Sequence, residues 1–401
     1  MAKTVPIVAA CLLIVFGHFG CLAQSDRPTP SPEAGSSNAQ INFYPYQQGW
    51  LGGDAAYSVP LSPGRTLWLF GDTFIGRPDA TDRSAAYGMP RNSVGIANCP
   101  VSGNCQIKYF WSHMGSTAPA AFFDTKSSDW YWPLDGFVAN GSLYVFLEAM
   151  HNQGTGAFGF DYSGVVLATI SDFSGSPDKW KVKYQTVLKG NVAVPGTALV
   201  TQQGSGVNPF PADPHGAAFA YAFTWDKPKS GSTFTGLTRI PLSKLERAAL
   251  ADGNWDYLTS GNVWAPWTGV TLPEDARHVM DAGYTEFTVK YHSEAGKPGK
   301  WMAVMPSSGF MDKRGVYSVA ESIAGPWTAP ATLYTYPEMQ PTNPSYTTNV
   351  FCYADKEHPE LEQGNALVFT YACNSLKLPE VMADKTLYHP VLITVPFPSR
   401  P

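Results

Sequence analysis

Charged residues are scarce in this sequence: Lys, Arg, Asp and Glu make up 15% of its 401 residues. The 27 basic residues are fewer than the 32 acidic ones, and they form no basic stripe along the chain. A nucleic-acid-binding surface needs such a stripe, so the sequence predicts no nucleic acid partner. The 44% hydrophobic content likewise argues against a disordered chain.

Helix signals are also nearly absent, the exception being one short stretch at 242–251. The chain is rich instead in turn formers, with 37 Gly and 34 Pro residues, and 13% of it is aromatic. This composition is typical of an ordered all-β protein with many turns.

Long hydrophobic runs are missing except at residues 5–20, a run that follows Lys3 and is too short to span a membrane. We therefore predict a signal peptide over residues 1–23, followed by a flexible Pro- and Ser-rich linker at 24–40. The Gly20-Cys21 pair also fits a lipoprotein signal, so a lipid anchor at Cys21 is an alternative. Either reading predicts an exported protein, whether periplasmic, extracellular or anchored at the cell surface.

Cysteine is rare in this sequence, with six residues in all. Cys11 and Cys21 belong to the signal region, which leaves an even number for an oxidising compartment. We predict one disulfide across a short loop and one between neighbouring strands, namely Cys99–Cys105 and Cys352–Cys373. Neither spacing resembles a zinc site.

One kind of apolar strand recurs five times along the chain. The copies lie at 66–70, 142–146, 218–223, 301–305 and 366–371. One strand-like run precedes each copy and another follows it. In four of the five cases a further, more polar run comes after these, which gives a unit of four strands. Units of four strands predict a five-bladed β-propeller, whereas a two-layer sandwich would not give that grouping.

The last copy lacks its fourth strand because the chain ends. We predict that residues 41–46 supply this strand, complete the last blade and close the ring, so that 41–401 form a single domain. Closure of this kind would leave no exposed sheet edge.

The strands of such a blade alternate in direction, so certain strand ends share one face of the ring. We call that face the mouth. Asp54 begins the first strand of blade one and Asp72 ends the second, and the ends of other strands add further polar groups. The remaining mouth candidates are Arg91, Asn92, Asp135, Glu148, His151, Tyr284, Glu286 and Asn374. His358 and its charged neighbours, in contrast, are predicted to form a turn on the opposite face.

Paired carboxylates across a groove are the equipment of glycoside hydrolysis, in which one protonates the leaving oxygen and the other activates water or attacks the sugar. The catalytic candidates are Asp54, Asp72, Asp135 and Glu286. Trp50 and Trp132 lie close in sequence to mouth acids and are candidate platforms for sugar rings. Arg91, Asn92, Glu148, His151, Tyr284 and Asn374 complete the predicted substrate-binding set.

Several motifs resemble a known family. They are the stretches at 53–61, 67–76 and 91–93, together with Lys356-Glu-His-Pro-Glu-Leu and Tyr371-Ala-Cys-Asn-Ser. They are similar to those of bacterial exported five-bladed propellers of unknown function, which are allied to arabinanase- and fructosidase-type glycosidases and to endo-D-arabinanases.

This resemblance implies hydrolysis of a furanoside or another polysaccharide by mouth carboxylates, with no cofactor required. In the arabinanase type a blade-one Asp is the base, a blade-two Asp tunes the acid and a blade-three Glu is the acid. Asp54 and Asp135 match the first two positions, but the Glu occurs in blade four as Glu286. The endo-D-arabinanase type suggests that Asp54 and Asp72 act as a pair.

Two other functions remain open at this point. The propeller could bind carbohydrate at the cell surface without cleaving it. Its mouth acids could instead hold a structural calcium ion, because carboxylate oxygens are the ligands that calcium prefers.

Overall fold

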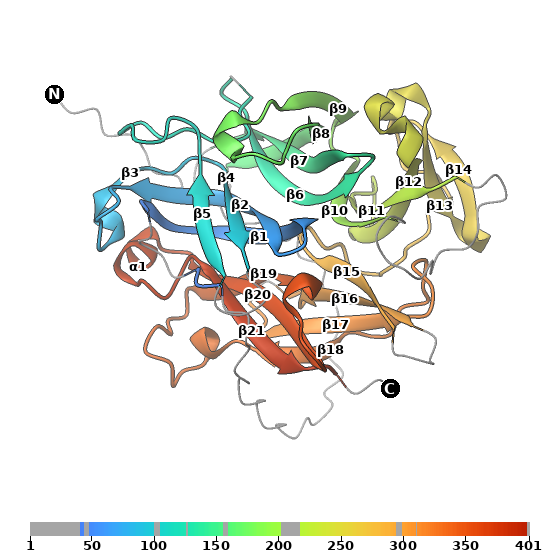
Figure 1. The fold of residues 1–401 in the computed structure, drawn as a ribbon. Coiled ribbons are helices and arrows are strands. Elements are labelled where there is room, and N and C mark those ends of the chain that lie inside the picture. The colour runs from blue at the N-terminus through green and yellow to red at the C-terminus, as the bar shows by residue number, and fades with distance from the viewer. Residues whose placement is uncertain are drawn as a thin grey trace.

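The structure is a computed structural model that describes residues 41–43, 48–99, 105–125, 127–154, 159–201, 217–293, 299–309 and 311–398. Five antiparallel sheets surround a common centre (Figure 1). The predicted five-bladed β-propeller is therefore confirmed. The predicted signal peptide and linker lie outside the described residues.

The first two blades cover the amino-terminal part of the described chain. Blade one contains β1 (Trp50–Ser62), β2 (Arg65–Gly76), β3 (Ala86–Gly88), β4 (Ser93–Asn98) and β5 (Gln106–Phe110). Blade two contains β6 (Trp130–Ala139), β7 (Ser142–Asn152), β8 (Phe160–Ile170) and β9 (Lys183–Lys189). In both, the first strand is innermost, since β1 and β6 contact each other near the centre.

The other three blades differ in their number of strands. Blade three has β10 (Ala193–Thr201), β11 (Phe219–Asp226), β12 (Phe234–Pro241), β13 (Trp255–Thr259) and β14 (Val263–Trp267). Blade four has β15 (Thr288–His292), β16 (Lys300–Pro306), β17 (Arg314–Ala320) and β18 (Ala331–Thr335), and blade five has β19 (Val350–Glu357), β20 (Ala366–Ser375) and β21 (Pro390–Pro396). The described helices are the α-helix α1 (Leu378–Ala383) and seven short 3-10 helices, two of which form the helical stretch expected at 242–251.

The recurring apolar runs are the second strands of the blades, and both of their faces are buried. In β2, Leu67 and Leu69 pack in a cluster with blade two, whereas Trp68 and Phe70 pack in a cluster that includes Val368 of blade five. Because successive side chains point to opposite faces, a strand between two blades must be apolar at nearly every position.

The innermost strands β1, β6, β10 and β19 are bulged. Their pairing registers shift near 53–57, 133–136, 195–198 and 353–356 respectively. The bulges of β1 and β19 include alanines in the left-handed region: Ala55 has φ 67°, Ala56 has φ 69° and Ala354 has φ 65°. A bulge bends a strand and re-aims its side chains, so these irregularities decide which groups face the centre of the ring.

Ring closure differs from the prediction. The described start of the chain forms a parallel bridge from Ile41 to Cys105, beside blade one, and blade five has three strands in the part of the chain that the structure describes. Ile41 and Phe43 are buried in the cluster between blades one and five. The described start of the chain thus buries its apolar side chains between two blades, which is favourable by itself and does not require a strand position in the fifth sheet. Residues 44–47 lie outside the described ranges.

Both predicted disulfides are confirmed. Cys99 pairs with Cys105 across the loop between β4 and β5, and Cys352 pairs with Cys373 across β19 and β20. No helix among the described residues is long and apolar enough to cross a membrane.

A buried arginine ties blade one to the segment after β20. The Arg83 side chain is fully buried and donates to the backbone oxygens of Leu51, Val381, Asp384 and Leu387. One guanidinium thus donates hydrogen bonds to four backbone carbonyl groups.

Replacing Arg83 with Met is expected to lower the free energy of unfolding by at least about 3 kcal/mol, because buried carbonyl oxygens would lose their donors. Urea unfolding of both proteins would measure the loss. Arg77→Met is the control, since the Arg77 side chain is 56% exposed. A similar loss in both variants would contradict the role assigned to Arg83.

Candidate active site

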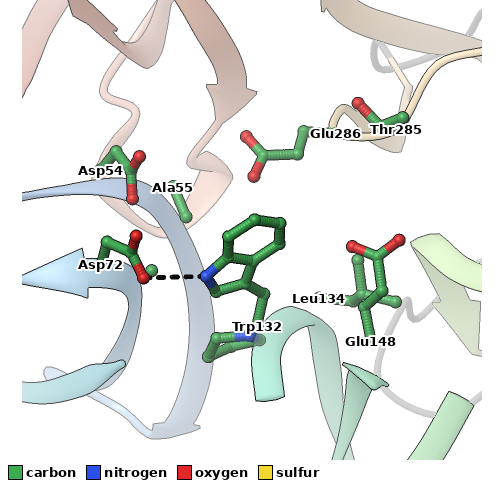
Figure 2. A pocket seen from close by; sticks show the side chains of 10 residues that line it. Asp54, Ala55, Asp72, Trp132, Leu134, Glu148, Thr285 and Glu286 are labelled. Atoms are coloured by element: carbon green, nitrogen blue, oxygen red, sulfur yellow. Dashed lines mark hydrogen bonds between the residues drawn. The ribbon is translucent and has the colours of Figure 1, made fainter. Parts of the chain in front are cut away.

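A pocket lies where the innermost strands approach one another at the mouth. Its polar lining comes from Asp54, Asp72, Glu148 and Glu286, and Trp132 lies between these acids (Figure 2). The space among the side chains measures about 460 Å³, part of which is open to solvent. Carboxyl groups from blades one, two and four therefore converge on one site.

Asp72, at the far end of β2, is held by two donors. Trp132 Nε1 donates to its Oδ1 at 2.9 Å, and Arg91 Nη1 donates to its Oδ2 at 3.1 Å. The Arg91 guanidinium also lies 4.2 Å from the ring centroid of Trp130, which fixes its position. An adjacent cation and two hydrogen bonds favour the ionised carboxylate.

Asp54 occupies the bulge of β1 and is in a different environment. Burial, reinforced by the negative charges of Asp72 and Glu286, raises its pKa to about 8. The Tyr353 hydroxyl donates to Asp54 Oδ2 at 2.6 Å and opposes this shift, as does the charge of Lys356. Asp54 is therefore protonated at neutral pH beside the carboxylate of Asp72.

Glu286, just before β15, is paired with a lysine that is fully buried. Lys356 Nζ lies 2.9 Å from Glu286 Oε2, and it also donates to the backbone oxygens of Ala55 and Ala354. The Glu286 side chain is 13% exposed, so solvent screens this pair weakly.

Glu148, on β7, repeats the behaviour of Asp54. Burial and the charges of Glu286 and Asp161 raise its pKa to about 8. The pocket thus combines two carboxyl groups with raised pKa values, Asp54 and Glu148, and two with cationic partners, Asp72 and Glu286. Such a difference between neighbouring carboxyl groups is what proton donation to a leaving group and attack by a base require.

Asp135 is buried and does not line this pocket. Its two oxygens accept from the backbone amides of Gly136 and Leu199, which joins the bulge of β6 to β10. Burial raises its pKa. Asp135 therefore joins two blades, and its catalytic role stays a prediction.

Two candidates for substrate binding lie in the core. Trp50 is fully buried, stacks on Tyr109 at 4.5 Å between ring centroids and donates to Ser93, so it cannot act as a platform for sugar. Asn92 is also fully buried, and its amide bonds to the backbone of Phe123 and Tyr131. Both side chains point into the blade because strand neighbours alternate between faces.

Three other candidates lie near the mouth without lining the pocket. Tyr284 is buried and its ring packs near Phe287. His151 follows Glu148 on β7, opposite Asp161 of β8. Asn374 is buried and donates to the Tyr353 hydroxyl at 3.4 Å, so it supports the partner of Asp54.

Two residues at the site were missed from the sequence. Lys356 and Tyr353 belong to β19, yet the charged run around Lys356 was interpreted as a turn on the opposite face. His358, in the same run, is fully buried between Ser58 and Thr370, and burial lowers its pKa. A charged run usually marks a solvated segment, and the local sequence held no signal that this one is central.

A calcium ion in the mouth stays a prediction. Among the described residues, the mouth carboxyls do not form a compact set of three that could hold a metal. The Asp72 and Glu286 carboxylates already have Arg91 and Lys356 as cationic partners. The site can therefore balance its charge with side chains alone.

The raised pKa of Asp54 predicts a pH-dependent cost of folding. The neutral carboxyl contributes stability that is fully present below pH 3.8 and is lost as the pH rises towards about 8. We therefore compare the free energy of unfolding of Asp54→Asn with that of the wild type at about pH 5 and at about pH 9. This difference should shift in favour of the variant by on the order of 3 kcal/mol from the lower to the higher pH.

Urea unfolding at these two pH values would test this expectation. Asp79→Asn is the matched control because the Asp79 side chain is 76% exposed. If the stability of Asp54→Asn differed from that of the wild type by the same amount at both pH values, the assigned protonation would be contradicted.

Solved structures of other proteins are similar to this chain. A "putative hydrolase" of Bacteroides ovatus ATCC 8483 is 16% identical, with a TM-score of 0.62 over 86% of each chain, which shows a shared fold. A β-xylosidase/α-arabinofuranosidase from a compost microbial metagenome is 13% identical, with a TM-score of 0.45 over 91% of this chain and 94% of that one. An exo-1,5-α-L-arabinanase from a bovine ruminal metagenomic library is 9% identical, with a TM-score of 0.40 over 88% and 94%.

No curated protein matches the chain. Residues 40–395 match the family model described as a domain of unknown function, DUF5005, which confirms the resemblance to a propeller family of unknown function. The chain therefore belongs to the DUF5005 family.

Proposed function

We propose that this protein is a glycoside hydrolase whose reaction takes place in the mouth pocket. The observation that carries the proposal is that Asp54 and Asp72 line one pocket in different environments: Arg91 and Trp132 donate to Asp72, whereas burial raises the pKa of Asp54 to about 8. A donor that is protonated at neutral pH beside an anionic partner is the minimum equipment for cleaving a glycosidic bond.

Asp54 protonates the leaving glycosidic oxygen as the bond to the anomeric carbon breaks. Asp72, oriented by Arg91 and Trp132, either attacks that carbon or removes a proton from the attacking water. The Trp132 indole is part-buried, and its ring offers an apolar face inside the pocket. Glu148 and Glu286 lie across the pocket as further polar contacts to sugar hydroxyls.

The substrate class is inferred from the sequence motifs and the disulfides. A furanoside polysaccharide is favoured by the resemblance of the sequence motifs to arabinanase-type propellers. Two disulfides support export, since they persist in oxidising compartments. These features fit a protein that acts on a glycan outside the cytoplasm.

A panel of furanose- and pyranose-based polysaccharides, assayed for released reducing sugar, would test the activity. Asp54→Asn and Asp72→Asn should each lower the rate on a cleaved glycan by about 10²–10⁴-fold, the range expected for loss of an acid or base. The wild-type rate should fall above about pH 8 as Asp54 loses its proton.

Asp79→Asn, which changes an exposed acid that does not line the pocket, should retain the wild-type rate. Folded Asp54 and Asp72 variants with full activity would refute these roles. Saturable sugar binding without release of reducing ends from any glycan would identify a carbohydrate-binding propeller instead.

A further inference from the structure

A second cluster of titratable groups lies away from the mouth, between blades four and five. It contains His292, Glu357 and Glu362, whose nearest ligand atoms all lie within 4.8 Å of one another. His292 is the last residue of β15, and Glu357 is the last residue of β19. Because Glu286 precedes β15 at the mouth, the cluster lies at the other end of that strand.

Neighbouring strands of the two blades bring the cluster together. Thr288, Lys290 and His292 share one face of β15 because strand side chains alternate. The Thr288 hydroxyl accepts from the Glu357 backbone amide at 2.8 Å, which places this face against β19. Glu362 joins from the segment after the 3-10 helix η7 (Pro359–Leu361), where its Oε1 accepts from the Val368 amide at 3.3 Å.

The Glu357 carboxyl group is buried without a well-aligned hydrogen-bond donor for either oxygen. Its side chain is fully buried, and neither oxygen accepts a hydrogen bond of good geometry, although Oε1 lies 2.7 Å from His292 Nε2. Glu362 lies beside it, and burial, the Glu357 charge and a side-chain hydrogen bond with Glu357 raise the pKa of Glu362 to about 9.

We propose that His292, Glu357 and Glu362 bind a divalent transition-metal cation of the zinc class. One imidazole nitrogen and two carboxylate oxygens form a three-ligand set that zinc accepts, with water completing four-fold coordination. Calcium is disfavoured because it prefers oxygen ligands alone. A divalent cation here would give the buried Glu357 oxygens, which lack a well-aligned hydrogen-bond donor, a binding partner.

The surroundings of the cluster orient its ligands. The Phe397 ring packs edge-on against His292 at 4.7 Å between centroids, which restricts the imidazole. The hydrogen bond from the Val368 amide fixes one oxygen of Glu362. A metal bound in this position would cross-link blade four to blade five and thereby stabilise the ring.

Thermal unfolding of chelator-treated protein with added Zn²⁺ tests this proposal. Saturating Zn²⁺ should raise the Tm of the wild type by about 2–5 °C, because a ligand that binds only the folded state stabilises it. The same concentration of Ca²⁺ should leave the Tm unchanged. Calorimetric titration should give one site, with affinity reduced at least about 100-fold by His292→Gln.

Glu357→Gln gives a test that does not depend on loss of folding. Gln keeps the size and shape of the Glu357 side chain, so this variant should fold, yet Zn²⁺ should no longer raise its Tm. His113→Gln, which changes an exposed histidine, should respond to Zn²⁺ as the wild type does. Absence of a Zn²⁺ response in the wild type, or a response retained in both His292 and Glu357 variants, would overturn the proposal.

Discussion

The buried ammonium group of Lys356 joins three blades at the centre of the ring. It contacts the Glu286 carboxylate of blade four, the Ala55 carbonyl of blade one and the Ala354 carbonyl of its own blade. The chain forms this contact only after the fifth blade has returned to the first, so one cation both helps to close the propeller and sets the charge of the mouth. Removing it would leave a largely buried carboxylate without its partner, which is far costlier than losing an exposed ion pair.

The bulges of the innermost strands explain why such polar groups can lie at the centre at all. A regular strand would alternate its side chains between the two neighbouring blades, both of which are apolar. The left-handed alanines at 55, 56 and 354 interrupt that alternation, and the acid at position 54 and the lysine at position 356 lie beside them. Left-handed backbone at non-glycine residues is costly and persists only where the surrounding structure enforces it.

The sequence predicted the blades well because their signal is local. Each second strand is apolar on both faces, and that pattern can be read within a few residues. The ends of strands likewise predicted that Asp54, Asp72, Glu148 and Glu286 would meet at one mouth, and the pocket contains all four. Errors arose where side-chain direction mattered: Trp50 at the start of β1 and Asn92 just before β4 lie at the predicted end of the blade, but both side chains are buried in it. The pleat of a strand and the position of a bulge determine the direction in which a side chain points. Neither can be read from the residue types alone.

The protonation of Asp54 was beyond sequence reasoning for a related reason. Every group that acts on its carboxyl comes from elsewhere in the chain: Asp72 from the next strand, Glu286 from blade four, and Tyr353 and Lys356 from blade five. Burial raises the pKa of this group most, and burial itself exists only in the closed ring. The acid and the anion are therefore distinguished by the assembled propeller, so a change in a distant blade that loosens closure would alter the chemistry of Asp54 before it altered the local fold of β1.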